Sequence, residues 1–390
     1  MSLKGAAYIV GAWEHPTRKA PDKSVAQLHA ECARGALEDA GLTKDDVDGY
    51  FCAGDAPGTL GSLSMVDYMN LKVRHVDSTD VGGSSYQVAV GHAMESIAAG
   101  RCNVALITLA GRPRSEGMAT GTAPRPGNPA VPEMQFEFPY GPATANLYGM
   151  CAQRHMYEYG TTSEQLAWIK VAASHHAQHN PNAMLRDVVT VEDVVKSPII
   201  SSPLHRLDCC VISDGGGALV LARPEIAKSL KRPKVKVIGV GESPKHQGGG
   251  ELDLTFTAAR WSGPPAWEMA GIKPSDIKYA SIYDSFTITV LMQLEDLGFC
   301  EKGQGGKFVS DGNLIAGVGK LPFNTDGGGL CSNHPANRGG ITKIIEAVRQ
   351  LRGEAHPALQ VKNCDLAIAH GTGGALGTRH CGSTVILERE

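Results

Sequence analysis

The sequence lacks a strong excess of charge of either sign. Its 390 residues carry 37 Lys and Arg against 40 Asp and Glu, for a formal net charge of −3. Proteins that bind nucleic acids or anionic membrane surfaces usually carry a basic excess, which this chain does not have. The charge balance therefore gives no reason to expect a nucleic acid or a membrane as a partner.

Long apolar runs and paired cysteines are missing as well. Residues 6–13 form an apolar run that is too short for the core of a signal peptide, and no other stretch has the length needed to cross a bilayer. The ten cysteines contain no Cys-x-x-Cys pair, which argues against a zinc ribbon, and their scatter is typical of a reducing compartment. We therefore expect a cytoplasmic protein with mostly buried free thiols.

Three short patterns occur twice, in the same order, in the two halves of the chain. They are Gly-x-x-Glu-x-Pro, Ala-x-Glu-x-Ala-Gly, and a cysteine that precedes an apolar strand-like stretch. The copies begin at Gly11 and Gly239, at Ala36 and Ala266, and at Cys102 and Cys364. Three ordered matches indicate an internal duplication.

Each copy alternates strand-like and helix-like segments, which predicts a largely buried α/β sheet in each half. We place the first half at residues 1–230 and the second at residues 231–390. Residues 111–200 form a long excursion, rich in Gly and Pro at first and helical afterwards, and excursions of this length usually have a function. The expected architecture is two similar α/β halves with one inserted lobe.

Residues 80–87, with the sequence Asp-Val-Gly-Gly-Ser-Ser-Tyr-Gln, stand between an extended segment and a predicted helix over residues 86–99. We call this stretch the elbow. Glycine permits the tight turn, serine can cap the helix, and the first N–H groups of the helix would face a bound group. Such elbows commonly present a nucleophile or hold an anion.

Four further motifs follow one another along the chain. They are Leu-Asp-Cys-Cys-Val-Ile-Ser-Asp-Gly-Gly from Leu207, Tyr-Asp-Ser-Phe-Thr from Tyr283, Asn-Thr-Asp-Gly-Gly-Gly-Leu-Cys-Ser-Asn-His-Pro from Asn324, and His-Gly-Thr-Gly-Gly from His370. In this combination the chain resembles the thiolase superfamily, on its sterol-carrier and lipid-transfer-protein-like branch. The resemblance covers essentially the whole length. It implies a duplicated αβαβα fold, a homodimer, and an acyl-CoA thioester as substrate.

The sequence departs from the family pattern at the elbow, where Gly82 stands at the position of the nucleophilic cysteine. Of the other functional groups, the activating His is retained as His334. Tyr283 replaces the Asn or His expected before Asp-x-Phe, and His370 and Thr372 replace the C-terminal Cys-x-Gly. Without a thiolate, acyl transfer through a covalent intermediate should be very slow.

The remaining groups suit proton transfer and stabilisation of an enolate, which is the chemistry of aldol or retro-aldol reactions on a CoA thioester. The resemblance extends to steroid side-chain aldolases of the same branch, which use tyrosines. We expect Tyr283 to act as general base or proton shuttle, and His334 and His370 as acid/base groups or oxyanion donors. The substrate carbonyl is expected at Gly82, Gly83, Ser84 and Gly374. On family grounds we expect CoA as part of the substrate, no tightly bound cofactor or metal, and a small partner subunit with an OB fold and a zinc ribbon.

Two other functions remain open from the sequence. One is a thiolase or acyltransferase with a displaced nucleophile such as Cys331, and the other is a non-catalytic subunit that binds acyl-CoA as a scaffold. His175 and His179 have metal-ligand spacing on a helix, but no acidic residue accompanies them, which argues against a metal site. Aromatic residues in the stretch 111–142, namely Phe136, Phe138 and Tyr140, are expected to line or cover the acyl site. The identity of the acyl group and the direction of the reaction do not follow from the sequence.

Overall fold

The computed structural model describes residues 3–54, 56–120, 135, 137–248, 252–335 and 339–390. Within them, one nine-stranded mixed sheet has the order β3-β2-β4-β7-β1-β8-β11-β10-β9. Its strands are β1 Tyr8–Glu14, β2 Gly49–Cys52, β3 His75–Ser78, β4 Val104–Gly111, β7 Gly215–Ala222, β8 Val235–Pro244, β9 Tyr279–Ile282, β10 Leu366–Ala375 and β11 Thr378–Arg389. The two halves of the sheet meet where β1 pairs with β8 through two residue pairs.

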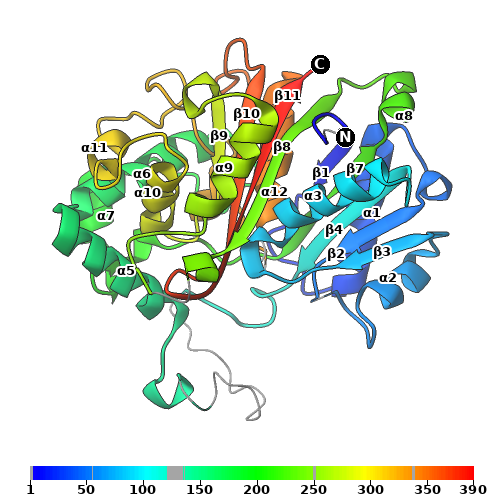
Figure 1. Cartoon of the computed structure of the whole chain (residues 1–390). Helices are drawn as coiled ribbons and strands as arrows, with labels where there is room; N and C mark the ends of the chain where they lie inside the picture. The colour runs from blue at the N-terminus through cyan, green and yellow to red at the C-terminus, as the bar shows by residue number, and fades with distance from the viewer. Residues whose placement is uncertain (1–2, 55, 121–134, 136, 249–251, 336–338) are drawn as a thin grey trace.

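Helices cover the sheet in three layers (Figure 1). They are α1 Val25–Ala40, α2 Ser62–Met69, α3 Ser85–Ala98, α5 Thr144–Tyr159, α6 Ser163–Ala177, α7 Val191–Lys196, α8 Pro224–Ser229, α9 Ala259–Ala270, α10 Thr287–Asp296, α11 Gly305–Val309 and α12 Gly340–Arg352. In Figure 1, α1 and α2 lie on one side, α9 and α10 on the other, and α3 and α12 between them. The layers alternate as αβαβα, as the sequence predicts.

The side chains of the strands explain this layering. Along β4, Val104 and Leu106 pack into the outer core with α1, whereas Ile107 and Leu109 pack into the central core with α3 and α12. In the second half, Ile368 of β10 packs into the outer core with α9. Both faces of every such strand are therefore buried, which is why these strands read as continuous apolar runs in the sequence.

The internal duplication is confirmed by matching contacts in the two halves. A Cβ atom at Gly11 would lie 2.2 Å from the backbone oxygen of Ala36 in α1, and one at Gly239 would lie 2.3 Å from that of Ala266 in α9. Each glycine is needed because a helix crosses its strand at very short distance. The two helices also end alike, at glycines with φ of 70° and 69°.

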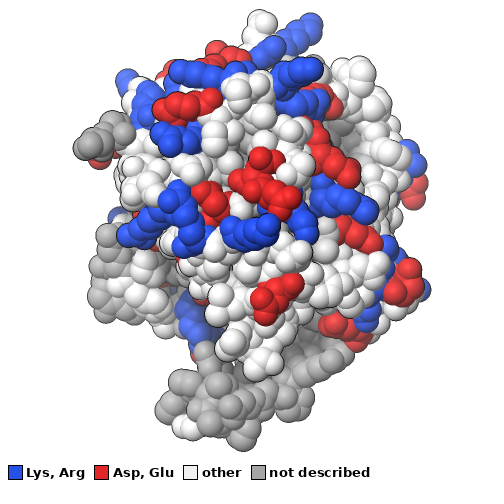
Figure 2. Space-filling model, turned by 90° about the vertical axis from the view of Figure 1, so that its right-hand side faces the viewer, with Lys and Arg blue, Asp and Glu red and all other residues white. Residues whose placement is uncertain are grey.

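The lobe between the halves is helical from α5 onward, as expected. Although the lobe lies within the first half of the chain, its helix α6 packs on α10 and α11 of the second half. A short hairpin, β5 Ile199–Ser201 with β6 Leu204–His205, closes the lobe. Among the described residues, no helix is long and apolar enough to cross a membrane. On the face shown in Figure 2, Lys and Arg side chains alternate with Asp and Glu, in keeping with the net charge of −3.

Candidate active site

The elbow forms the predicted turn between β3 and α3. A 3₁₀ turn, η2 Gly82–Ser84, leads directly into α3, and Gly82 has φ +68°, which favours glycine. The Ser85 hydroxyl accepts a hydrogen bond from the Val81 amide at 2.9 Å and donates one to the Gly82 oxygen at 2.7 Å. The serine that fixes the turn is thus Ser85.

The elbow has no room for a side chain at either glycine. A Cβ at Gly82 would lie 2.7 Å from the Gly374 nitrogen on β10. At Gly83 it would lie 2.3 Å from the Thr372 oxygen and 2.7 Å from the hydroxyl oxygen of Tyr283. The space above the elbow, where a nucleophilic side chain would project, is filled by the backbone of β10 and the Tyr283 ring. This is the physical reason why a cysteine cannot stand here.

Tyr283 and His334 are brought together, as the sequence predicts. The Tyr283 hydroxyl lies 2.9 Å from His334 Nε2, and the two rings meet edge to face with centroids 5.5 Å apart. Burial, with Cys210 and Tyr148 nearby, raises the pKa of Tyr283 well above its ordinary value. Burial lowers the pKa of His334 to about 4. At neutral pH the pair is therefore a phenol beside an uncharged imidazole.

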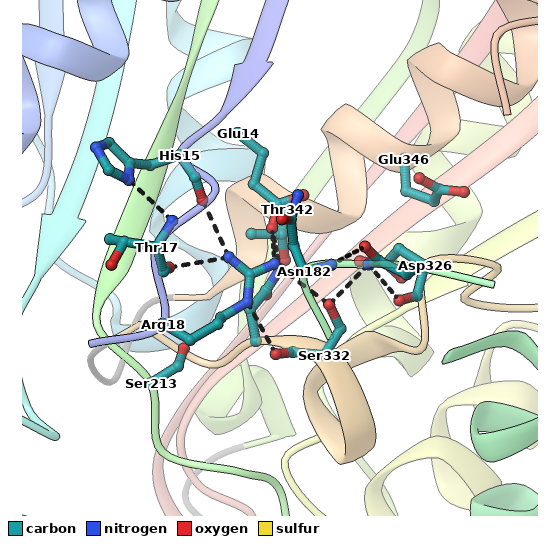
Figure 3. A network of polar contacts seen from close by, with 12 residues as sticks. Glu14, His15, Thr17, Arg18, Asn182, Ser213, Asp326, Ser332, Thr342 and Glu346 are labelled. Carbon is teal, nitrogen blue, oxygen red and sulfur yellow. Dashed lines mark hydrogen bonds and ion pairs between the residues drawn. The ribbon is translucent and has the colours of Figure 1, made fainter. Parts of the chain in front are cut away.

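The loop that carries His334, in the second half of the chain, is fixed by contacts from the first half (Figure 3). Arg18, from the loop after β1, donates to the backbone oxygen of Ser332 at 3.0 Å and is itself paired with Glu14. The His334 amide donates to the Ser213 hydroxyl at 2.9 Å. These contacts hold the imidazole in place because the backbone is fixed both at Ser332 and at His334 itself.

A buried ion pair lies beneath the same loop. Asp284, the residue after Tyr283, accepts hydrogen bonds from the amides of Gly329 and Leu330 at 2.8 and 3.2 Å, and lies 2.8 Å from Lys343 Nζ on α12. Burial alone would lower the pKa of Lys343, but Asp284 and other nearby carboxylates raise it. Asp284 thus anchors the π-helical turn η7 Gly328–Ser332, which leads to His334.

His370 does not join this pair. Its Nδ1 lies 2.9 Å from the Thr384 hydroxyl, which contacts Ser262 on α9 at 3.1 Å. The ring is therefore on the outer face of the sheet, opposite Gly371, whose Cα faces the elbow. Burial lowers the pKa of His370 to about 3. The sequence placed His370 in the right motif, but strand alternation turns its side chain away.

Ser84 and Gly374, which are expected at the substrate carbonyl, lie at the edge of the site and are held there by hydrogen bonds. The buried Ser84 hydroxyl donates to the backbone oxygens of Val81 and Cys381 at 3.0 and 3.2 Å. Gly374, at φ +75°, lies against the elbow, and its oxygen accepts a hydrogen bond from the Tyr148 hydroxyl at 2.8 Å. Sequence reasoning missed Tyr148, which comes from the inserted lobe and has no motif.

A cavity of about 400 Å³ opens beside the pair, between the loop at residues 114–120 and the loop at residues 206–212. Cys210 and Val211 line it, and their amides donate to the Ser285 oxygen at 2.9 Å and to the Gly329 oxygen at 2.8 Å. The cavity therefore adjoins the segment that carries Tyr283 and the turn that leads to His334. Of the expected acyl-site aromatics, Phe136 lies outside the described residues, as does the side chain of Phe138, and Tyr140 is 88% exposed.

The two weaker candidates from the sequence are also located. Cys331 is 1% exposed, and burial raises the pKa of its thiol. The His179 ring stacks on His356, and in the described part of the chain no cluster of three or more His, Cys, Asp or Glu side chains is arranged to hold a metal ion.

The family model for the thiolase C-terminal domain matches residues 241–389. The acetyl-CoA acetyltransferase of Methanothermobacter thermautotrophicus is 32% identical, over 92% of this chain and 93% of its own. The steroid side-chain-cleaving aldolase of Thermomonospora curvata is 35% identical, over 90% of this chain and 91% of its own. Sterol carrier protein 2 of Bos taurus is 32% identical, over 60% of this chain and 45% of its own.

Among solved structures, the Ltp2-ChsH2(DUF35) aldolase superposes with a TM-score of 0.88 at 31% identity, and the match covers 100% of this chain and 99% of that chain. The acetyltransferase and the side-chain-cleaving aldolase are more than 30% identical over at least 90% of the chain, and the fold agrees with that of the solved aldolase. The chain therefore belongs to the thiolase superfamily, as an enzyme of the branch that resembles sterol carrier protein 2.

Proposed function

We propose that the protein catalyses aldol or retro-aldol chemistry on an acyl-CoA thioester, without a covalent cysteine intermediate. The observation that carries the proposal is the Tyr283 hydroxyl, which lies over Gly83 and 2.9 Å from His334 Nε2. An acid/base pair occupies the place where an acyl-forming nucleophile would stand. The relatives named as steroid side-chain-cleaving aldolase and as 17-hydroxy-3-oxo-4-pregnene-20-carboxyl-CoA lyase support this class of reaction.

In the cleavage direction, the proton of a β-hydroxyl group passes to the Tyr283 oxygen while Tyr283 passes its own proton to His334 Nε2. The electron pair of the O–H bond becomes the new C=O bond, and the Cα–Cβ bond breaks. Its electrons move to the thioester carbonyl, which becomes an enolate. The proton taken up by His334 then returns through Tyr283 to Cα, which completes the products and restores both groups. The raised pKa of Tyr283 and the lowered pKa of His334 mean that both groups are uncharged before the relay begins. We therefore propose that Tyr283 gives its proton to His334 only as the β-hydroxyl proton reaches the Tyr283 oxygen.

The space directly above the elbow is filled by β10 and the Tyr283 ring. We therefore propose that the positive end of the α3 dipole, rather than a hydrogen bond inside the elbow, stabilises the enolate oxygen. The Gly82 amide already donates to Asp80 Oδ1 at 3.1 Å, so the stabilisation is assigned to the helix end rather than to the Gly82 amide. His370 has no role in this scheme because its ring lies on the other face of the sheet.

Acyl transfer is the alternative function, and it is supported by the relative that is named as an acetyl-CoA acetyltransferase. It requires a thiolate within reach of the thioester. Cys331 is 1% exposed with a raised pKa, and Cys210, although it lines the cavity, also has its pKa raised by burial. Neither thiol has the environment of a nucleophile, which favours the aldol reaction.

Replacing Tyr283 by Phe tests the proposal. Turnover of a β-hydroxyacyl-CoA, followed by chromatography of the CoA products, should fall at least ~100-fold because the proton relay is lost. Tyr157→Phe is the matched control, since Tyr157 is 80% exposed on α5. Unchanged turnover in Tyr283→Phe would refute the assignment. An acylated enzyme in mass spectra would favour acyl transfer instead.

We further propose that the enzyme works as a homodimer with a small partner subunit. The partner subunit is supported by the solved structure that superposes on this chain, which is that of the Ltp2-ChsH2(DUF35) aldolase. The assay should therefore be run with and without the candidate partner. Tight acyl-CoA binding without turnover in either condition would favour the scaffold function over catalysis.

A further inference from the structure

The cavity beside Tyr283 is bordered by three positively charged side chains. Arg114 and Arg206 are exposed at its rim, and Lys170 of α6 lies at its inner wall with only 2% exposure. Among the residues that the structure describes, none of the three takes part in an ion pair. The cavity therefore combines a net positive lining with one deeply buried ammonium group.

Lys170 has little to compensate its charge. Its Nζ donates to the backbone oxygen of Leu330 at 2.6 Å and contacts the Cys331 thiol. Burial raises the pKa values of Cys331 and of nearby Cys209, so both thiols stay uncharged at neutral pH. Burying an ammonium ion without a counter-ion is costly, and such groups usually have an anionic partner.

The same chain shows how a buried lysine is normally satisfied. Lys343 is equally buried and pairs with Asp284 at 2.8 Å. Lys170 has no such carboxylate, and its side chain borders an open cavity instead of closed protein. The missing partner is thus expected to come from the ligand.

We propose that the cavity accepts an acyl group that carries a second carboxylate, which pairs with Lys170. The inference rests on the proposed function, because it takes the thioester to be bound at Tyr283. Cys210 lines the cavity, and its amide donates at 2.9 Å to the oxygen of Ser285, two residues after Tyr283, so a group inside the cavity belongs to the reacting end of the substrate. The phosphates of CoA are separated from that end by the whole pantetheine arm. Arg114 and Arg206 attract the anion at the entrance.

Calorimetric titration with two unreactive thioesters tests the proposal. Glutaryl-CoA and valeryl-CoA have acyl chains of equal length, and they differ by a terminal carboxylate in place of a methyl group. The wild-type enzyme should bind glutaryl-CoA at least ~10-fold more tightly, the usual minimum for a charge-assisted hydrogen bond in a buried site. Lys170→Met should abolish the difference and leave the binding of valeryl-CoA and free CoA unchanged.

Lys196→Met is the control, since Lys196 is exposed and paired with Glu192. Should Lys170→Met not fold, Arg114→Gln and Arg206→Gln, both at the exposed rim, should still reduce the preference. Equal binding of the two thioesters by the wild type would overturn the proposal. An equal loss for both thioesters and free CoA in Lys170→Met would also overturn it, by assigning the lysine to the CoA phosphates.

Because these titrations need no turnover, they separate this inference from the proposed function. Tyr283→Phe should be inactive yet keep the preference for glutaryl-CoA. If the wild type binds neither thioester nor CoA, the acyl-CoA function itself fails. If it binds all of them without preference, only the carboxylate site fails.

Discussion

Gly83→Ala is the sharpest test of how the elbow and Tyr283 fit together. The new methyl carbon would lie 2.3 Å from the Thr372 backbone oxygen, and 2.6 and 2.7 Å from Cζ and the hydroxyl oxygen of Tyr283. Because the strand backbone cannot yield, the Tyr283 ring must move away and lose its hydrogen bond to His334. We expect a loss of about 1–3 kcal/mol in the free energy of unfolding, typical of overpacking, and a fall of at least ~100-fold in turnover.

Gly91→Ala is the matched control on the same helix. A Cβ there would meet only Val240, at an ordinary 3.8 Å. Because glycine inside a helix costs conformational entropy, this variant should gain about 0.5–1 kcal/mol of stability with unchanged turnover. Urea unfolding and the product assay measure both quantities. Normal turnover in Gly83→Ala would refute this reasoning, because it would mean that catalysis does not require Tyr283 to lie over Gly83 and bond to His334.

Three further outcomes follow from the site and its surroundings. The lowered pKa of His334 predicts that kcat/KM falls only as the pH approaches 4, where His334 becomes protonated and can no longer accept a proton. A profile of kcat/KM against pH that already falls near pH 6.5 would contradict this. Lys343→Met leaves Asp284 buried without its partner and should cost about 3–5 kcal/mol by urea unfolding, whereas Lys196→Met on the surface should change stability by less than ~1 kcal/mol. Burial lowers the pKa of His29 from 6.5 to about 4, so its contribution to stability is complete above pH 6.5 and is lost as the pH falls toward 4, by up to ~1.4 kcal/mol per pH unit; an unfolding midpoint that does not change between pH 7 and 5 would contradict it.

The fold was predictable because its signals are local and repeated. Gly11 and Gly239 begin matching patterns, and each lies where a helix crosses its strand too closely for a side chain. Apolar strands buried on both faces leave continuous hydrophobic runs in the sequence, which indicate a covered α/β sheet. Because these features depend on a few residues that are close in the chain, they can be predicted from the sequence alone.

The sequence also determined the chemistry that is missing. Gly82 and Gly83 exclude a nucleophile at the elbow whatever surrounds them, and the motifs bring Tyr283 and His334 into consideration as an acid/base pair. What the sequence could not determine is the direction in which a side chain points from its strand. His370 belongs to the right motif, yet it faces the outer core.

Tertiary structure decided the rest, because it joins residues that are distant in the chain. Tyr148 and Lys170 come from the inserted lobe, and only the packing of that lobe on the second half sets them beside the site. The pKa values of Tyr283 and His334 depend on burial, which no motif encodes. The sequence thus specified which groups are present and which is absent, while the packing specified which of them meet and how each is charged.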